Sequence, residues 1–405
     1  MSSTASSAVA LSTASERVGS ERLPTFEGSR QFLDLSFLAQ SWYCRWINAE
    51  SEAAAAHRTA LLDMAEKDPR WARRMMDIYA WDTFLAMNWP QGSGDGGPNQ
   101  SLPDSNVYVP VWSSWARKDE LPNKFSPDPN RNWRCEGNCL ETDLPGETGT
   151  DATDPLIAQN GQYVYFESRA NPVVAEQLKT YWESTLLPPI TFRAGQCLRG
   201  GDQYDRAPAV ELKLAWKVLD PKVDDSKRFF MVENVRLPSR DSEQVVNLGL
   251  VAMHVMPKVK TRDWIAMTFE HVDNAPDQSA VGGGRTWSFF NPACTHCVEN
   301  VPSNGTPVQL TRTTPIDADT QALNQEVQSW LRTQKSVWQY YELVGTQNLT
   351  SSTPSPDELR NTVLEAYMVP PQKAASSCLG CHDKSKSRDF SFLADDVLGW
   401  SQLSK

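Results

Sequence analysis

The chain has 405 residues, 40% of them hydrophobic, and a formal net charge of -11. This length and composition predict a globular protein with one large domain or two closely packed ones. The acidic charge argues against a nucleic-acid partner, which needs a basic face, and without a run of about 18 apolar residues we expect no membrane span.

The N-terminal part of the sequence predicts a flexible start followed by helices. Residues 1–25 are rich in Ser and Ala and are expected to form a disordered lead-in, with neither a basic segment nor an apolar segment typical of a secretory signal. Residues 26–106 are expected to form a helical N-terminal region. In it, helices are expected over about 30–66 and 69–88. Apolar residues of the second recur at spacings of three and four, which is typical of an amphipathic helix: Trp71, Met75, Ile78, Trp81 and Leu85.

Residues 107–320 predict an antiparallel β region with long loops, because apolar and β-branched runs alternate there with short turns. A hairpin is expected at Asn160-Gly161, because this pair suits a type I′ turn. The expected strands cover residues 210–219, 228–237, 245–256, 264–272 and 285–290. Residues 321–405 are expected to form a C-terminal helical region, with helices over 320–333 and 357–368 separated by an extended stretch at 337–346. The sequence therefore predicts an α+β fold, with an antiparallel sheet of five or more strands flanked by N-terminal and C-terminal helices.

The C-terminal region contains the motif Cys378-Leu-Gly-Cys381-His382. This CxxCH pattern is typical of covalent attachment of c-type haem. Positions three and four apart share one helix face, so Cys378, Cys381 and His382 can address a single porphyrin. The two thiols would bond to the haem, and His382 would be the proximal iron ligand. One covalently attached haem c is the expected cofactor.

The other cysteines include two closely spaced pairs, Cys135/Cys139 and Cys294/Cys297. Their spacing predicts local disulfides, which form in an oxidising compartment. We therefore expect a periplasmic or otherwise extracytoplasmic protein. A different interpretation is a structural zinc site in which Cys294 and Cys297 join the two cysteines of the CxxCH motif.

A second iron ligand is expected from the strands. His254 lies in a run that is apolar on both faces and therefore buried, and His271 lies at a strand end. Either could ligate iron, or be a hydrogen-bonded core residue. Four methionines could pack in the core or could instead supply a thioether ligand to the iron: Met253, Met256, Met267 and Met368.

Polar residues inside the expected strands suggest chemistry beside the cofactor. Glu211 shares a strand face with Lys213, and Glu270 lies opposite the apolar residues of its own strand. One interpretation is a solvated sheet face. The other is that Glu211, His254 and Glu270 converge near the haem as catalytic, proton-handling groups.

Several blocks of this sequence resemble a group of large, mostly uncharacterised bacterial cytochrome c-type proteins with a single C-terminal CxxCH haem motif. The resembling blocks are residues 84–90, 211–216, 249–254, 268–274, 376–382 and 389–393. The resemblance implies a secreted haem protein.

The size of the chain distinguishes the possible functions. A small electron carrier needs roughly 100 residues to wrap a haem, so most of this chain exceeds that need. We therefore expect a haem-dependent oxidoreductase of oxidase or peroxidase type, with a substrate pocket beside the iron. The alternatives are a non-catalytic electron-transfer or haem-sensing module and, third, a zinc-stapled binding protein. The expected partners are a redox protein or a small-molecule oxidant or substrate.

Overall fold

The computed structural model of this chain describes a central sheet, helices on both of its faces, and the C-terminal motif. The described residues are 69–90, 105–118, 120–121, 156–183, 189–194, 196–197, 204–206, 208–237, 244–260, 263–280, 285–302, 305–348, 358–367 and 377–395. The expected lead-in at 1–25, the pair Cys135/Cys139 and Met368 lie outside these residues.

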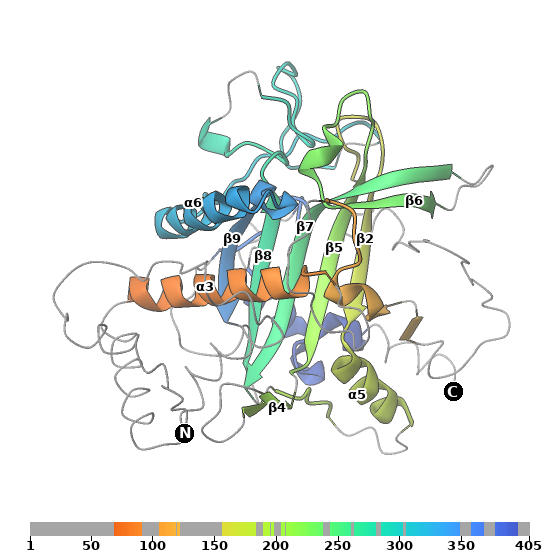
Figure 1. The fold of residues 1–405 in the computed structure, drawn as a ribbon, viewed down its shortest axis with the longest axis vertical. Helices are drawn as coiled ribbons and strands as arrows, with labels where there is room; N and C mark the ends of the chain where they lie inside the picture. The colour runs from red at the N-terminus through yellow and green to blue at the C-terminus, as the bar shows by residue number, and fades with distance from the viewer. Residues whose placement is uncertain are drawn as a thin grey trace, which may run out of the picture.

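The core of the fold is a seven-stranded antiparallel sheet with the order β1-β2-β5-β7-β8-β9, in which β6 also pairs with β7 (Figure 1). Its strands are β1 (Ala116–Arg117), β2 (Val164–Ala170), β5 (Val210–Val218), β6 (Met231–Leu237), β7 (Gln244–Lys260), β8 (Asp263–His271) and β9 (Tyr341–Asn348). A separate pair is formed by β3 (Gln196–Cys197) and β4 (Tyr204–Arg206). The predicted α+β fold is confirmed.

The register places two sets of side chains on opposite faces of the sheet, because successive residues of a strand point to alternate sides. Lys213 lies opposite His254, and His254 lies opposite Thr268, so these three share a face. We call it the C-terminal face. The neighbouring residues Met253 and Phe269 pair on the other face, which we call the helical face.

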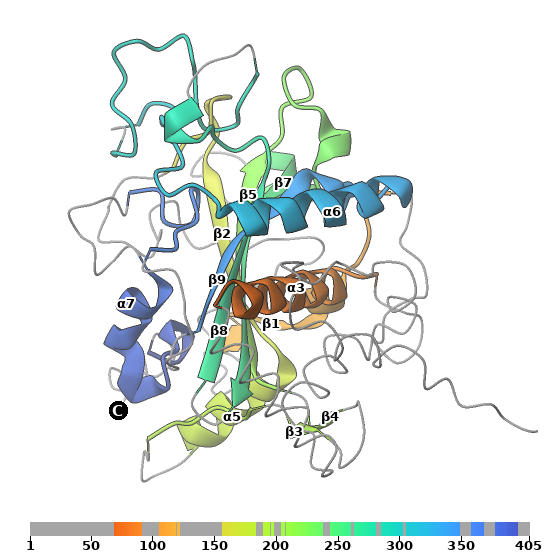
Figure 2. The ribbon, with the colours of Figure 1, turned by 90° about the vertical axis from the view of Figure 1, so that its left-hand side faces the viewer.

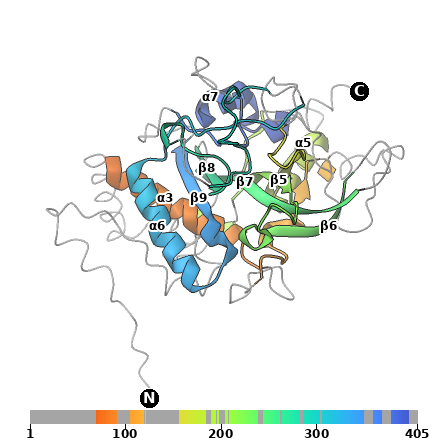
Figure 3. The same ribbon diagram turned by 90° about the horizontal axis from the view of Figure 1, so that it is seen from above.

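Two helices cover the helical face, α3 (Pro69–Met87) and α6 (Ala318–Thr333) (Figures 2 and 3). Phe84 of α3 stacks on Phe269 at a centroid distance of 4.0 Å. The two helices are tied together by Trp81, whose indole Nε1–H donates to Asn324 Oδ1 at 2.9 Å. Asp317 starts α6 by accepting the N–H of Asp319, as a helix N-cap does.

The C-terminal face is covered by chain segments far away in sequence. Residues 358–367 and 377–395 lie on it, and α7 (Cys378–His382) is on the opposite side of the sheet from α3 and α6 (Figure 3). The helix α5 (Pro172–Glu183) packs near one end of the sheet (Figure 1). The remaining short helices are η2 (Val111–Ser114), η3 (Ser226–Arg228), η4 (Gln278–Ala280), η5 (Val337–Tyr340) and η7 (Asp383–Arg388).

Two expected elements differ from the structure. The strand predicted at 285–290 is irregular, because the N–H groups of Ser288 and Phe289 bond to the carbonyls of Asp273 and Asn274 in the turn after β8. The helix expected over 357–368 is also absent from the described residues, because 362–367 form turns, whereas the stretch expected to be extended at 337–346 contains the start of β9. Among the described residues, no helix combines the length and the hydrophobicity that crossing a bilayer requires.

Candidate functional site

The CxxCH motif forms its own short helix. Ser377 starts α7, since its Oγ accepts the N–H of Gly380 at 2.9 Å and its carbonyl accepts the N–H of Cys381 at 3.1 Å. The helical turn brings Cys378, Cys381 and His382 to neighbouring positions, as the spacing predicted. Neither cysteine of the motif is in a disulfide.

The ring of His382 is fixed by the chain that follows it. Its Nδ1 lies 2.6 Å from the carbonyl oxygen of Phe390. Because a carbonyl only accepts, Nδ1 carries the hydrogen and a neutral ring has its lone pair on Nε2. Burial, with a smaller contribution from the positive charge of Lys213, lowers the pKa of His382 to about 4 against the raising effect of the Phe390 hydrogen bond, so the ring is neutral at pH 7. Nε2 is therefore the ring nitrogen of His382 that could bind a metal.

His254 pairs with an acid that the sequence did not indicate. Its Nε2 lies 2.7 Å from Glu365 Oε1, and Glu365 Oε2 accepts the N–H of Asn361 at 2.8 Å. Burial raises the pKa of Glu365, but His254, Lys213 and the N–H of Asn361 outweigh it and hold the pKa below its ordinary value. Glu365 is thus a carboxylate, and His254 Nε2–H donates to it, which leaves Nδ1 as the second ring nitrogen.

The charges around the motif come from three separate elements. Lys213 on β5 lies opposite His254 in the register, and its charge acts on both Glu365 and His382. Burial, and then the negative charge of Glu365, raise the pKa of the Cys378 thiol. A thiol-exchange centre needs a lowered thiol pKa, so Cys378 does not resemble one. We call this set the motif cluster, formed by Lys213, His254, Glu365, Cys378, Cys381 and His382.

Glu211 lies on the same face and holds the chain after the motif. Its Oε1 accepts the hydroxyl of Ser391 at 2.6 Å, and Ser391 Oγ accepts the N–H of Ala394 at 2.9 Å. Glu211 is buried at 8% exposure. This contact gives it a structural task in addition to any role in proton transfer.

Glu270 also lies on this face, but it belongs to a buried ion cluster. Its two carboxylate oxygens accept Arg312 Nη2–H at 3.2 Å and the N–H of Thr362. Arg312 also pairs with Glu342 at 2.6 Å and with Asp277 at 3.1 Å. Glu211, His254 and Glu270 thus share one sheet face but have different hydrogen-bond partners, and their convergence beside a haem stays a prediction.

His271 lies on the helical face, stacked on Phe229 at 4.2 Å between ring centroids. Its Nε2 bonds to the carbonyl of Arg228 at 2.9 Å, and its Nδ1 accepts the N–H of Asp273 at 3.1 Å. Both ring nitrogens are occupied, and burial lowers the pKa of His271 to about 4. His271 has no nitrogen left for iron, which corrects the expectation that it is an iron ligand.

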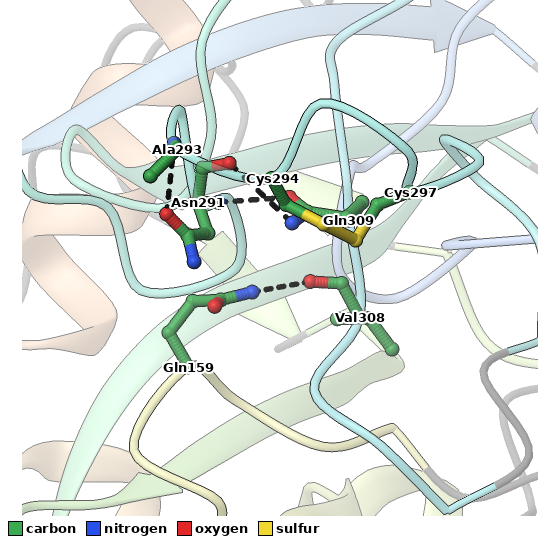
Figure 4. Close-up of a disulfide and its surroundings, with 7 residues drawn as sticks. All are labelled: Gln159, Asn291, Ala293, Cys294, Cys297, Val308 and Gln309. Atoms are coloured by element: carbon green, nitrogen blue, oxygen red, sulfur yellow. Dashed lines mark hydrogen bonds between the residues drawn. A yellow bond between two sulfur atoms is a disulfide. The ribbon is translucent and has the colours of Figure 1, made fainter.

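The other sulfur groups are also placed. Met253 and Met267 lie on the helical face, away from the motif, whereas Met256 lies on the C-terminal face in register with Glu211, and all three are buried. The predicted disulfide between Cys294 and Cys297 is present, in a loop anchored by Gln309 and Asn291 (Figure 4). Because those two thiols are joined to each other, they are not ligands of a Cys₄ zinc site, which corrects that alternative.

Taken together, the fold and the motif cluster define an α+β protein with a Cys/His site between a sheet face and a C-terminal helical segment. No family model matches the chain, and no curated protein and no solved structure is significantly similar to it.

Proposed function

We propose that this chain is a monohaem c-type redox protein, in which Cys378 and Cys381 hold the porphyrin and His382 ligates the iron. The observation that carries the proposal is the hydrogen bond from His382 Nδ1 to the Phe390 carbonyl, which leaves the lone pair on Nε2. A metal-bound His ordinarily donates its other N–H to such an acceptor. When bound, the haem supplies one-electron chemistry and a site for a small oxidant.

The motif cluster supports an oxidoreductase more than a simple electron carrier. Glu365 accepts Nε2–H of His254, so Nδ1 is the His254 nitrogen that is left to take a proton from a substrate. The carboxylate behind the ring stabilises the cation that forms. A positioned base of this kind contributes about 10²- to 10⁴-fold to a reaction rate. A peroxide or another small oxidant is the matching substrate class, with a redox protein as electron donor.

A bis-histidine electron carrier is the competing class. His271 is occupied on both nitrogens, and His254 could ligate iron only through Nδ1, because its Nε2–H is donated to Glu365. The resemblance of the CxxCH region to large cytochrome c-type proteins supports the proposal that the chain binds haem. The disulfide between Cys294 and Cys297 supports an extracytoplasmic compartment such as the periplasm.

The test is the visible spectrum of protein made in a host that matures c-type cytochromes. We expect a high-spin ferric haem that binds cyanide in the wild type. His254→Ala should keep this spin state and lower peroxide turnover about 100-fold or more, whereas His296→Ala, in the exposed disulfide loop, is the matched control. A low-spin wild type that becomes high-spin in His254→Ala would instead assign electron transfer, and protein that takes up no haem would contradict the whole proposal.

A further inference from the structure

The turn that presents the Phe390 carbonyl to His382 has an unusual backbone. Asp389 and Phe390 both adopt left-handed conformations, with φ of 57° and 66°. Each such non-glycine residue is disfavoured and persists only where its surroundings fix it. Phe390 N–H bonds to the carbonyl of Ser385 at 2.9 Å, which closes the turn after η7. The position of the carbonyl therefore depends on what holds this turn.

A buried cation of the sheet holds the first residue of the turn. Lys258 on β7 is 0% exposed, and its ammonium pairs with the carboxylate of Asp389. The same carboxylate oxygen accepts the N–H of Phe192 at 2.7 Å. The Lys258 ammonium also lies 5.1 Å from the ring centroid of Trp264. A buried charge without its partner is costly, so this pair fixes Asp389 firmly.

A buried carboxylate of the neighbouring strand holds the other side of the turn. Glu211 on β5 pairs in register with Met256, two residues before Lys258 on β7, so Glu211 and Lys258 share one end of the C-terminal face. The Glu211 carboxylate accepts the Ser391 hydroxyl at 2.6 Å. The carbonyl of Phe390 thus lies between two anchored residues, Asp389 and Ser391.

We propose that Lys258 and Glu211 are positioning residues that hold the Phe390 carbonyl on His382 Nδ1–H, and so set the tautomer and donor strength of His382. This inference rests on the proposed role of His382 as the iron ligand. A held carbonyl strengthens the imidazole as a donor. Releasing the turn would let the hydrogen of His382 exchange to Nε2, the nitrogen that the metal needs.

The first readout is independent of haem: the tautomer of His382 in the full haem-free chain, measured by long-range ¹H–¹⁵N correlation NMR. The main variant is Lys258→Met with Asp389→Asn, because it removes both buried charges together and Asn tolerates the left-handed backbone. We expect the ratio of Nδ1–H to Nε2–H forms to fall roughly fivefold, the factor carried by one hydrogen bond of about 1 kcal/mol.

A second variant pair keeps the test valid if the double variant does not fold. Glu211→Leu removes the acceptor of the Ser391 hydroxyl and should shift the same ratio, whereas Glu211→Gln keeps an acceptor oxygen and should restore it. The matched control is Lys386→Met with Asp383→Asn. It deletes an exposed ion pair on the same segment, with side-chain exposures of 69% and 58%, and should change nothing.

The second readout is the reduction potential of the haem-loaded protein. It should rise in Lys258→Met/Asp389→Asn and in Glu211→Leu, because a weaker donor stabilises the ferric state less. Folded variants that keep the wild-type tautomer ratio would overturn the positioning role, even in protein that carries haem. A shifted ratio in protein that never attaches haem would support the positioning role and contradict the proposed function instead.

Discussion

The buried cation Arg312 allows a direct test of whether Glu270 is a structural or a catalytic residue. The guanidinium contacts three carboxylates, Glu342 at 2.6 Å, Asp277 at 3.1 Å and Glu270 at 3.2 Å. The side chain of Arg312 is 9% exposed and that of Glu270 is 0% exposed. Solvent therefore cannot replace the cation once it is removed.

Arg312→Met should destabilise the protein severely. Breaking a buried ion pair costs about 3–5 kcal/mol because the remaining charge stays buried, out of a total stability of roughly 5–15 kcal/mol. The loss should depend on pH. Burial already raises the pKa of Glu342, against the opposing effect of Arg312. Without the cation, the folded pKa rises further above the unfolded value, so the variant loses more stability as pH rises from about 5 to 8.

The measurement is urea unfolding followed by tryptophan fluorescence at pH 5 and pH 8. Arg285→Met is the matched control, because its ion pair with Asp273 has an arginine side chain that is 46% exposed, and such pairs contribute at most about 1 kcal/mol. The reasoning is refuted if Arg312→Met costs no more than Arg285→Met. It also fails if Glu270→Gln abolishes turnover while Arg312→Met leaves stability unchanged.

Three further predictions concern groups outside the motif cluster. Burial lowers the folded pKa of His271 to about 4, below the unfolded value of 6.5. The free energy of unfolding should therefore decrease by about 3 kcal/mol as the pH is lowered from 6.5 to 4. His271→Gln should make this pH dependence weaker in urea titrations. Burial raises the pKa of Asp82 on α3 to about 8, so the free energy of unfolding should fall as the pH rises from 4 to 8. Asp82→Asn should therefore melt at a higher temperature than the wild type at pH 8 but not at pH 4. Replacing Cys294 and Cys297 by Ser should lower the free energy of unfolding by only about 2 kcal/mol, because the loop that the disulfide closes is short. In the wild-type protein both cysteines should resist alkylation without reductant, and alkylated thiols at these positions would contradict the disulfide.

The sequence predicted the elements whose apolar residues repeat regularly. The helix expected near 69–88 is α3, and the apolar run around His254 is the central strand β7. A turn also forms at Asn160-Gly161, as expected, but only Gly161, at φ 78°, has a positive φ, so the turn is not the type I′ turn that this pair favours. In each case the periodicity or the turn chemistry is local, so it could be read along the chain.

Elements fixed by distant contacts could not be predicted in this way. A helix was expected over 357–368, but residues 362–367 form turns. Asn361 explains the difference, because its side-chain amide donates to Thr268 Oγ1 and to the carbonyl of Phe269, while its Oδ1 accepts the N–H of Val363. These bonds tie the segment to β8, and tertiary contacts here override the helical pattern.

The residues of the candidate site also fall into those that a local pattern predicts and those that only distant contacts bring together. The spacing of Cys378, Cys381 and His382 is a local motif, and the sequence located it. Glu365 lies 111 residues from its partner His254, so no pattern linked them. The only signal for Glu365 was an acid within the otherwise apolar run Val363-Leu-Glu-Ala-Tyr367. A charged residue among apolar ones is rarely buried without a partner.

The central claim is covalent haem at Cys378 and Cys381, and acid–acetone extraction tests it most directly. Full-length protein is purified from a host that matures c-type cytochromes, beside Cys378→Ser/Cys381→Ser as the variant lacking both attachment points. We predict that the colour stays with the precipitated wild-type chain, that intact mass spectrometry finds one added haem, and that the variant gains none. Haem that extracts completely into the solvent, or a wild-type mass equal to that of the bare polypeptide, would contradict this account.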